Sequence, residues 1–166
     1  MKKRCLTLNA LLVAIMGVSV PAQDAGNLVK PYSVVWKSPS VDASGQMPLG
    51  NGDIAAGVYA IEDGDLYLLL AKNDALTYNG DIFKTGRAKI SLSPNPFAKG
   101  KPFKQTLDLA TGSILIEADG TTIRVWADAN KPVYHVQIDS PDDVSVSATS
   151  DLWERIDGCG HNSSKE

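Results

Sequence analysis

Aspartates near expected turns are the residues of this sequence that could carry out acid–base chemistry. Asp53, Asp74 and Asp81 each lie near an expected loop, and a glycosidase needs two carboxyl groups that flank one glycosidic bond. Sequence spacing does not give the separation of these groups in space, and Asp is also an ordinary turn residue. Two interpretations stay open, a catalytic pair or solvated turns, and we assign no catalytic residue.

Other catalytic and metal-binding patterns are weak. The sequence contains no G-x-S-x-G elbow. His135 falls on the polar side of an expected strand, and His161 lies close to the last residue. The acidic stretch 62–65 lacks the ligand spacing of a calcium loop, and the two histidines and Cys159 form no zinc pattern. We therefore expect neither a metal ion nor a cofactor.

The most distinctive local feature is the run MPLGNGD at residues 47–53. Glycine lets the backbone approach a neighbour closely or adopt a positive φ. Two interpretations stay open for this run. It could be a turn or bulge that leads into a buried strand, or a loop that presents Asn51 and Asp53 to a ligand or a neighbouring domain.

The first 22 residues have the layout of a secretory signal peptide. Lys2, Lys3 and Arg4 precede an apolar stretch over 6–20, and Ala22 ends a short segment suited to signal peptidase. The apolar stretch is shorter than the roughly 20 residues that a membrane-spanning helix needs. We expect cleavage after Ala22, export to the periplasm or the extracellular space, and no membrane association afterwards.

Composition agrees with an exported single domain. The 166 residues carry 16 basic and 19 acidic side chains, and removing the three basic residues of the leader leaves a net charge of −6. A mildly acidic chain argues against nucleic acid and anionic membranes as partners. Only Cys159 would survive cleavage, so no internal disulfide can form.

Apolar residues recur mostly at every second position, which predicts β-strands with one buried face. This alternation runs through residues 88–93, 122–128, 134–139 and 144–149. Residues 54–61 and 66–71 are apolar on both faces and predict central strands that are covered on both sides. Asp63-Gly64 and Asp119-Gly120 predict tight hairpins in which both residues have positive φ.

These patterns predict an all-β protein, an antiparallel β-sandwich. We expect a polar lead at 23–33, the sandwich domain at 34–155 and a disordered tail at 156–166. The proline-bearing stretch 94–102 cannot be a central strand, and a helical turn is expected only within 73–78.

Three segments resemble a known family. Trp36, the run MPLGNGDIAAGVYA at 47–60 and the run LYLLLAKNDALTYNG at 66–80 are similar to the opening of glycoside hydrolase family 95, the α-L-fucosidases. The run KISLSPNPF at 89–97 strengthens a closer resemblance to an uncharacterised bacterial family, found at the N-terminus of larger secreted proteins related to family 95. The similarity covers residues 34–155.

The resemblance implies an N-terminal β-sandwich of the large twisted type, here truncated. In family 95 a downstream (α/α)6 barrel carries the chemistry, so no catalytic residue is transferred to this chain. The resemblance implies a non-catalytic accessory domain that packs on such a barrel and shapes one wall of a sugar site. Trp36, Asn51, Asp53 and Asp74 are the candidates for that wall, because Trp offers an apolar ring face and Asn and Asp bind hydroxyl groups.

Two alternatives stay open. The chain could be a stand-alone glycan-binding module, which needs a groove with exposed aromatic side chains such as Trp126 or Trp153. It could also be a complete hydrolase, although no acid/base pair is identified. The expected partner is thus a carbohydrate or a downstream catalytic barrel.

Overall fold

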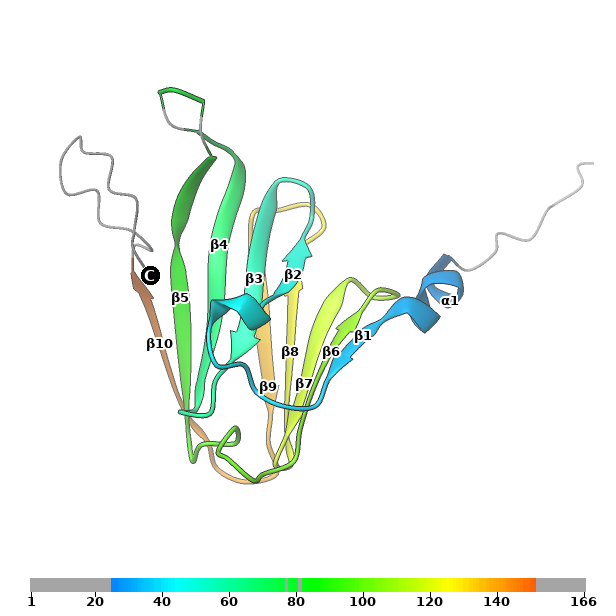
Figure 1. Ribbon diagram of the computed structural model, residues 1–166, viewed down its shortest axis with the longest axis vertical. Helices are drawn as coiled ribbons and strands as arrows, with labels where there is room; N and C mark the ends of the chain where they lie inside the picture. The colour runs from blue at the N-terminus through cyan, green and yellow to red at the C-terminus, as the bar shows by residue number, and fades with distance from the viewer. Residues whose placement is uncertain (1–24, 77, 81, 152–166) are drawn as a thin grey trace, which may run out of the picture.

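The computed structural model describes residues 25–76, 78–80 and 82–151. Within these residues, ten strands form two antiparallel five-stranded sheets that face each other, so the predicted all-β sandwich is confirmed (Figure 1). The expected signal peptide at 1–22 and the expected tail at 156–166 lie outside the described residues. No helix of the described part is long and apolar enough to cross a membrane.

The strands are assigned to the sheets as follows. Sheet I has the order β1 (Val34–Trp36), β6 (Phe103–Asp108), β7 (Ser113–Ala118), β8 (Thr121–Ala127) and β9 (Tyr134–Asp139). Sheet II has the order β10 (Ser145–Asp151), β5 (Ile82–Ser93), β4 (Asp65–Leu76), β3 (Ile54–Ala60) and β2 (Met47–Gly50). Short helical turns precede β1 and β2, namely α1 (Ala25–Val29), η1 (Lys30–Tyr32) and η2 (Ala43–Gly45).

The core lies between the inner faces of the two sheets. The alternating residues Ile114 and Ile116 of β7 and Ile123 and Val125 of β8 are fully buried, as strand periodicity requires. They belong to one apolar cluster with Leu66 and the other inner-face residues of sheet II. Packing of these side chains holds the sheets together.

A buried polar side chain also links the two sheets. Gln105 of β6 is 1% exposed, and its Nε2 donates a hydrogen bond of 3.1 Å to the backbone oxygen of Val58 in β3. The bond satisfies a polar group that would otherwise be costly to bury. Phe103 and Leu107 lie two positions on either side of Gln105 and pack in the core, so the strand period places this polar side chain on the inner face.

The central position of the two apolar strands is confirmed. β3 pairs with β2 and β4, and β4 pairs with β3 and β5. Their outer face is only partly covered, however, because Tyr67 and Leu69 are half-buried there. The expected helical turn at 73–78 is wrong, since β4 runs on to Leu76. The backbone bond from Asn73 N to Asp53 O and the pairing of Leu76 with Ile82 keep this segment extended.

The two predicted hairpins use different turns. At the β7–β8 hairpin, Asp119 and Gly120 have φ of 46° and 81°, as predicted. At the β3–β4 hairpin only Gly64 has a positive φ, 97°. There Gly64 N donates to Ile61 O and Ile61 N donates to Asp65 O, which makes a three-residue loop that ends in a left-handed glycine. The prediction of two positive φ angles is therefore wrong at Asp63-Gly64.

The prediction of one buried face is wrong for β10. Val146 is 48% exposed, and the other residues from Ser145 to Ser150 are exposed as well. β10 lies at the edge of sheet II, at the opposite edge from β2, which is the strand that approaches β7 and β8 of sheet I. Its inner face therefore receives little cover from the facing sheet.

The difference in burial between the core strand β7 and the edge strand β10 can be measured in unfolding experiments. We expect Ile116→Ala to lower the free energy of unfolding by about 2–5 kcal/mol and Ile116→Val by about 0.5–1.5 kcal/mol, because both leave space in a fully buried site. Val146→Ala should change it by less than about 0.5 kcal/mol. Equilibrium denaturation in urea tests this order, and a large loss for Val146→Ala would contradict the exposed edge.

Candidate functional site

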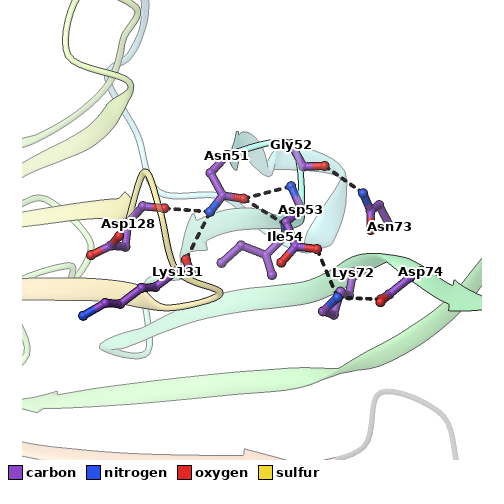
Figure 2. Close-up of polar contacts among 9 residues, drawn as sticks. All are labelled: Asn51, Gly52, Asp53, Ile54, Lys72, Asn73, Asp74, Asp128 and Lys131. Carbon is purple, nitrogen blue, oxygen red and sulfur yellow. Dashed lines mark hydrogen bonds and ion pairs between the residues drawn. The ribbon is translucent and has the colours of Figure 1, made fainter.

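The structure brings three of the four predicted site residues to one corner of the sandwich. Asn51 and Asp53 lie in the β2–β3 loop, and Asp74 lies near the end of β4. Lys72 joins the two aspartates, as Figure 2 shows. We call Asp53, Lys72 and Asp74 the polar corner.

Gly50 and Gly52 are each required at their positions, for different structural reasons. A Cβ on Gly50 would lie 2.7 Å from the backbone oxygen of Ile54, so a side chain there would force the hairpin apart. Gly52 has a φ of 94°, which other residues rarely adopt. The loop therefore depends on close backbone approach at Gly50 and left-handed geometry at Gly52. The interpretation of this run as a turn that leads into a buried strand is correct at Gly52, whereas Gly50 is the last residue of β2.

Asn51 fastens the loop to the opposite sheet. Its Oδ1 accepts hydrogen bonds from the backbone nitrogens of Asp53 and Ile54, at 3.0 and 2.9 Å. Its Nδ2 donates to the backbone oxygens of Asp128 and Lys131 in the β8–β9 loop, at 2.6 and 3.1 Å (Figure 2). An amide has two acceptor and two donor positions, and all four are used. Asn51 therefore positions the corner.

The end of β4 holds the loop from its other side. The backbone nitrogen of Asn73 donates to Asp53 O at 2.9 Å, and Asn73 Nδ2 donates to Gly52 O at 3.0 Å. Lys72 and Asp74 alternate with Asn73 along the strand and so point to the opposite side. Both the backbone and the side chains thus fix the place of Asp53 relative to Asp74.

Lys72 is shared between two carboxylates. Its Nζ lies 2.6 Å from Asp74 Oδ1 and 3.0 Å from Asp53 Oδ1. The hydrogen bond to Asp74 is the largest cause of the raised pKa of Lys72, and the bond to Asp53 is the next largest. The bond between Lys72 and Asp74 also lowers the pKa of Asp74. The two ion pairs use only the Oδ1 atom of each aspartate, so Oδ2 of each can accept a hydrogen bond from a hydroxyl group. Two carboxylates and one ammonium group give the corner a net charge of −1.

Sequence reasoning missed Lys72 and Tyr134. The Tyr134 hydroxyl is buried and makes no hydrogen bond within the described residues. Burial is the larger cause, and the nearby Asp53 carboxylate the smaller cause, of a pKa of Tyr134 that is raised to about 12. The phenol therefore stays protonated at neutral pH, beside the polar corner. The alternating pattern of β9 predicted only that Tyr134 faces inward.

A shallow groove runs from the corner along β3 and β4. One hollow of about 490 Å³ is lined by Asp53, Lys72 and Asn73 together with Ala55 and Ala71. A second hollow of about 380 Å³ shares the two alanines. Both volumes fall in the range of small-ligand sites.

Gln46 bounds the second hollow at the end away from the corner. A Cβ on Gly57 would lie 1.6 Å from Gln46 Oε1, so the glycine allows this side chain to lie across β3. The groove therefore has a floor of small residues and an amide at its far end.

Trp36 is separate from the corner. It lies in β1, at the edge of sheet I opposite β9, whereas the corner contacts the β8–β9 loop. Trp36 is half-buried and packs against the apolar core, so the structure does not bring it to the predicted wall.

Trp126 has its own partners on the outer face of sheet I. Its ring stacks on His135 with centroids 4.9 Å apart, and the Arg124 guanidinium lies 5.4 Å from the ring centroid. His135 Nε2 is 3.4 Å from Asp128 Oδ2. No three His, Cys, Asp or Glu side chains among the described residues could hold a metal ion together.

The fold and the corner define an all-β sandwich domain with a polar loop corner at one end. The chain belongs to the DUF5703 N-terminal domain family, described as a domain of unknown function, whose family model matches residues 35–165. This confirms the predicted membership of an uncharacterised N-terminal domain family. Searches of curated proteins and of solved structures found no match.

Removing the Asn51 amide tests its structural role. We expect Asn51→Ala to lower the free energy of unfolding by about 1–3 kcal/mol, because backbone groups at the corner lose their partners. Asn51→Asp, which keeps the acceptor oxygen, should lose less. Asn73→Ala is the control, since its side chain makes one exposed bond. Urea unfolding of the three variants measures this, and equal losses for Asn51→Ala and Asn73→Ala would contradict it.

Titration tests the shared lysine. Carbon-detected NMR of the Asp74 carboxyl should give a pKa below 3.8, the ordinary value. Because that pKa is lowered, the stabilisation from this pair is present above the ordinary value and is lost as pH falls through the lowered one. Lys72→Met should return the pKa of Asp74 toward its ordinary value. An unchanged pKa in the variant would show that the ion pair does not form in solution.

Proposed function

We propose that this chain is a non-catalytic accessory domain of a secreted carbohydrate-active protein, related to glycoside hydrolase family 95. The polar corner contributes one wall of a sugar site, and a downstream catalytic (α/α)6 barrel completes that site. The observation that carries the proposal is the meeting of Asp53 and Asp74 through Lys72 at one fixed, exposed corner.

The chemistry of the corner supports a wall role. Its exposed carboxylate oxygens are good acceptors for sugar hydroxyls, and the Asn51 clamp preorganises them. Lys72 bridges the two aspartates and lowers the pKa of Asp74, whereas the general acid of glycoside hydrolysis needs a raised pKa. Asp53 and Asp74 therefore fit binding better than acid catalysis.

A second candidate is the stand-alone glycan-binding module, which the groove beside the corner favours. A sugar ring could lie on the small-residue floor next to Asn73. Trp126 favours it less, because His135 and Arg124 already pack on the ring. The two candidates differ in whether the chain binds glycan by itself.

Calorimetry with the purified chain and fucosylated or plant-wall oligosaccharides separates them. The accessory function predicts no measurable heat, because one wall alone supplies too few contacts. When the downstream barrel is supplied with the domain, Asp53→Asn and Asp74→Asn should raise KM for the glycan about tenfold with little change in kcat, which is the loss of roughly one hydrogen bond to a charged group.

The control variant is Gln137→Ala, an exposed residue of sheet I, which should leave KM unchanged. Heat of binding by the chain alone, lost in Asp53→Asn, would establish the glycan-binding module instead. Turnover of an aryl fucoside by the chain alone, lost in Asp53→Asn or Asp74→Asn, would establish a hydrolase and overturn the proposal.

A further inference from the structure

β10 forms an open edge of sheet II. It pairs with β5 along its whole length, from Ser145↔Ser93 to Asp151↔Arg87, and no described strand pairs with its other side. The backbone groups on that side can accept another strand.

The sequence of β10 gives this edge little protection. Natural edge strands are commonly kept apart by lysine, proline or short length. β2, at the other edge of sheet II, spans four residues and contains Pro48. β10 spans seven residues, SVSATSD, without lysine, arginine or proline. The two edges of one sheet thus differ in their defence against pairing.

The same sequence is complementary to itself. In an antiparallel two-fold arrangement centred on Ala148, each Ala148 lies opposite its copy, Ser147 lies opposite Thr149, and Val146 lies opposite Ser150. Hydroxyl pairs and small apolar pairs are favourable across strands. No charged residue lies between Ser145 and Ser150, so no like charges meet in this register.

The exposed face of β10 supplies an apolar contribution. Val146 and Ala148 are paired with Leu92 and Ile90 of β5 and therefore share the inner side of sheet II. Both are exposed, Val146 by 48%. A second β10 beside the first would continue this apolar strip across the junction and remove part of it from water.

We infer that a second copy of this chain is the partner of β10, and that two chains join through antiparallel β10–β10 pairing centred on Ala148. The two copies of sheet II then form one continuous sheet. A single strand pair buries less surface than a standard protein interface, so the dimer is reversible and depends on concentration.

Charge substitution at the two-fold centre tests the pairing. Ala148→Lys and Ala148→Glu are both placed at an exposed position, and each should weaken dimerisation at least tenfold because like charges meet at the centre. An equimolar mixture of the two variants should restore the dimer. Sedimentation velocity over a range of concentrations gives the dissociation constants, and circular dichroism verifies that each variant is folded.

A second variant tests the register and does not depend on the first. The double change Ser147→Lys with Thr149→Glu sets opposite charges against each other twice in the proposed register, and it should tighten the dimer. Gln137→Lys on β9, an edge strand of the other sheet, is the matched control and should have no effect.

Two outcomes overturn the inference. The first is a monomer at every concentration, which would mean that β10 is left unpaired or is covered by another segment or protein. The second is a dimer that Gln137→Lys dissociates and Ala148→Lys does not, which would assign the interface to β9. Neither outcome bears on the proposed sugar wall, which the calorimetry and the barrel-dependent KM test separately.

Discussion

The amide of Asn51 determines the geometry of the candidate site. Its four hydrogen bonds join a loop of sheet II to a loop of sheet I and leave none of its donor or acceptor positions unused. The loop can be held in this way only because Gly50 permits close backbone contact and Gly52 permits a left-handed turn. The position of Asp53 follows from this clamp, and Lys72 of β4 links Asp53 to Asp74 of the same strand.

The electrostatics of the corner follow from a cation shared by two anions. Lys72 lowers the pKa of Asp74, and the two carboxylates in turn raise the pKa of Lys72. The buried Tyr134 phenol lies beside this charge and stays protonated. The corner therefore offers acceptors from the aspartates at a position that the backbone holds rigidly, which suits recognition of hydroxyl groups.

Much of the fold could be predicted from the sequence because burial imposes a period of two. The alternation in residues 122–128 predicted β8, and the apolar runs predicted the central positions of β3 and β4. The same pattern failed at β10, because alternation does not reveal whether a facing strand is present. The helical turn expected within 73–78 was also wrong, because the strand continues to Leu76, which pairs with Ile82 of β5.

The candidate site was only partly predictable. Asn51, Asp53 and Asp74 were correctly expected near loops, but the sequence could not show that Asn51 would be used up by backbone partners. Lys72 was missed because its role depends on the pairing of β3 with β4. Trp36 was grouped with them by resemblance, and its place in β1 separates it from the corner.

The order of strands has a consequence for how the chain acquires its structure. β2 to β5 form one consecutive meander and β6 to β9 form another, but β1 joins the second meander and β10 joins the first. Each meander closes through short local connections, whereas β1 must find β6 across a long stretch of chain, a slow step in folding. β1 and β10 are thus exchanged between the two meanders, so sheet I is complete only once β9 has formed and sheet II only once β10 has formed.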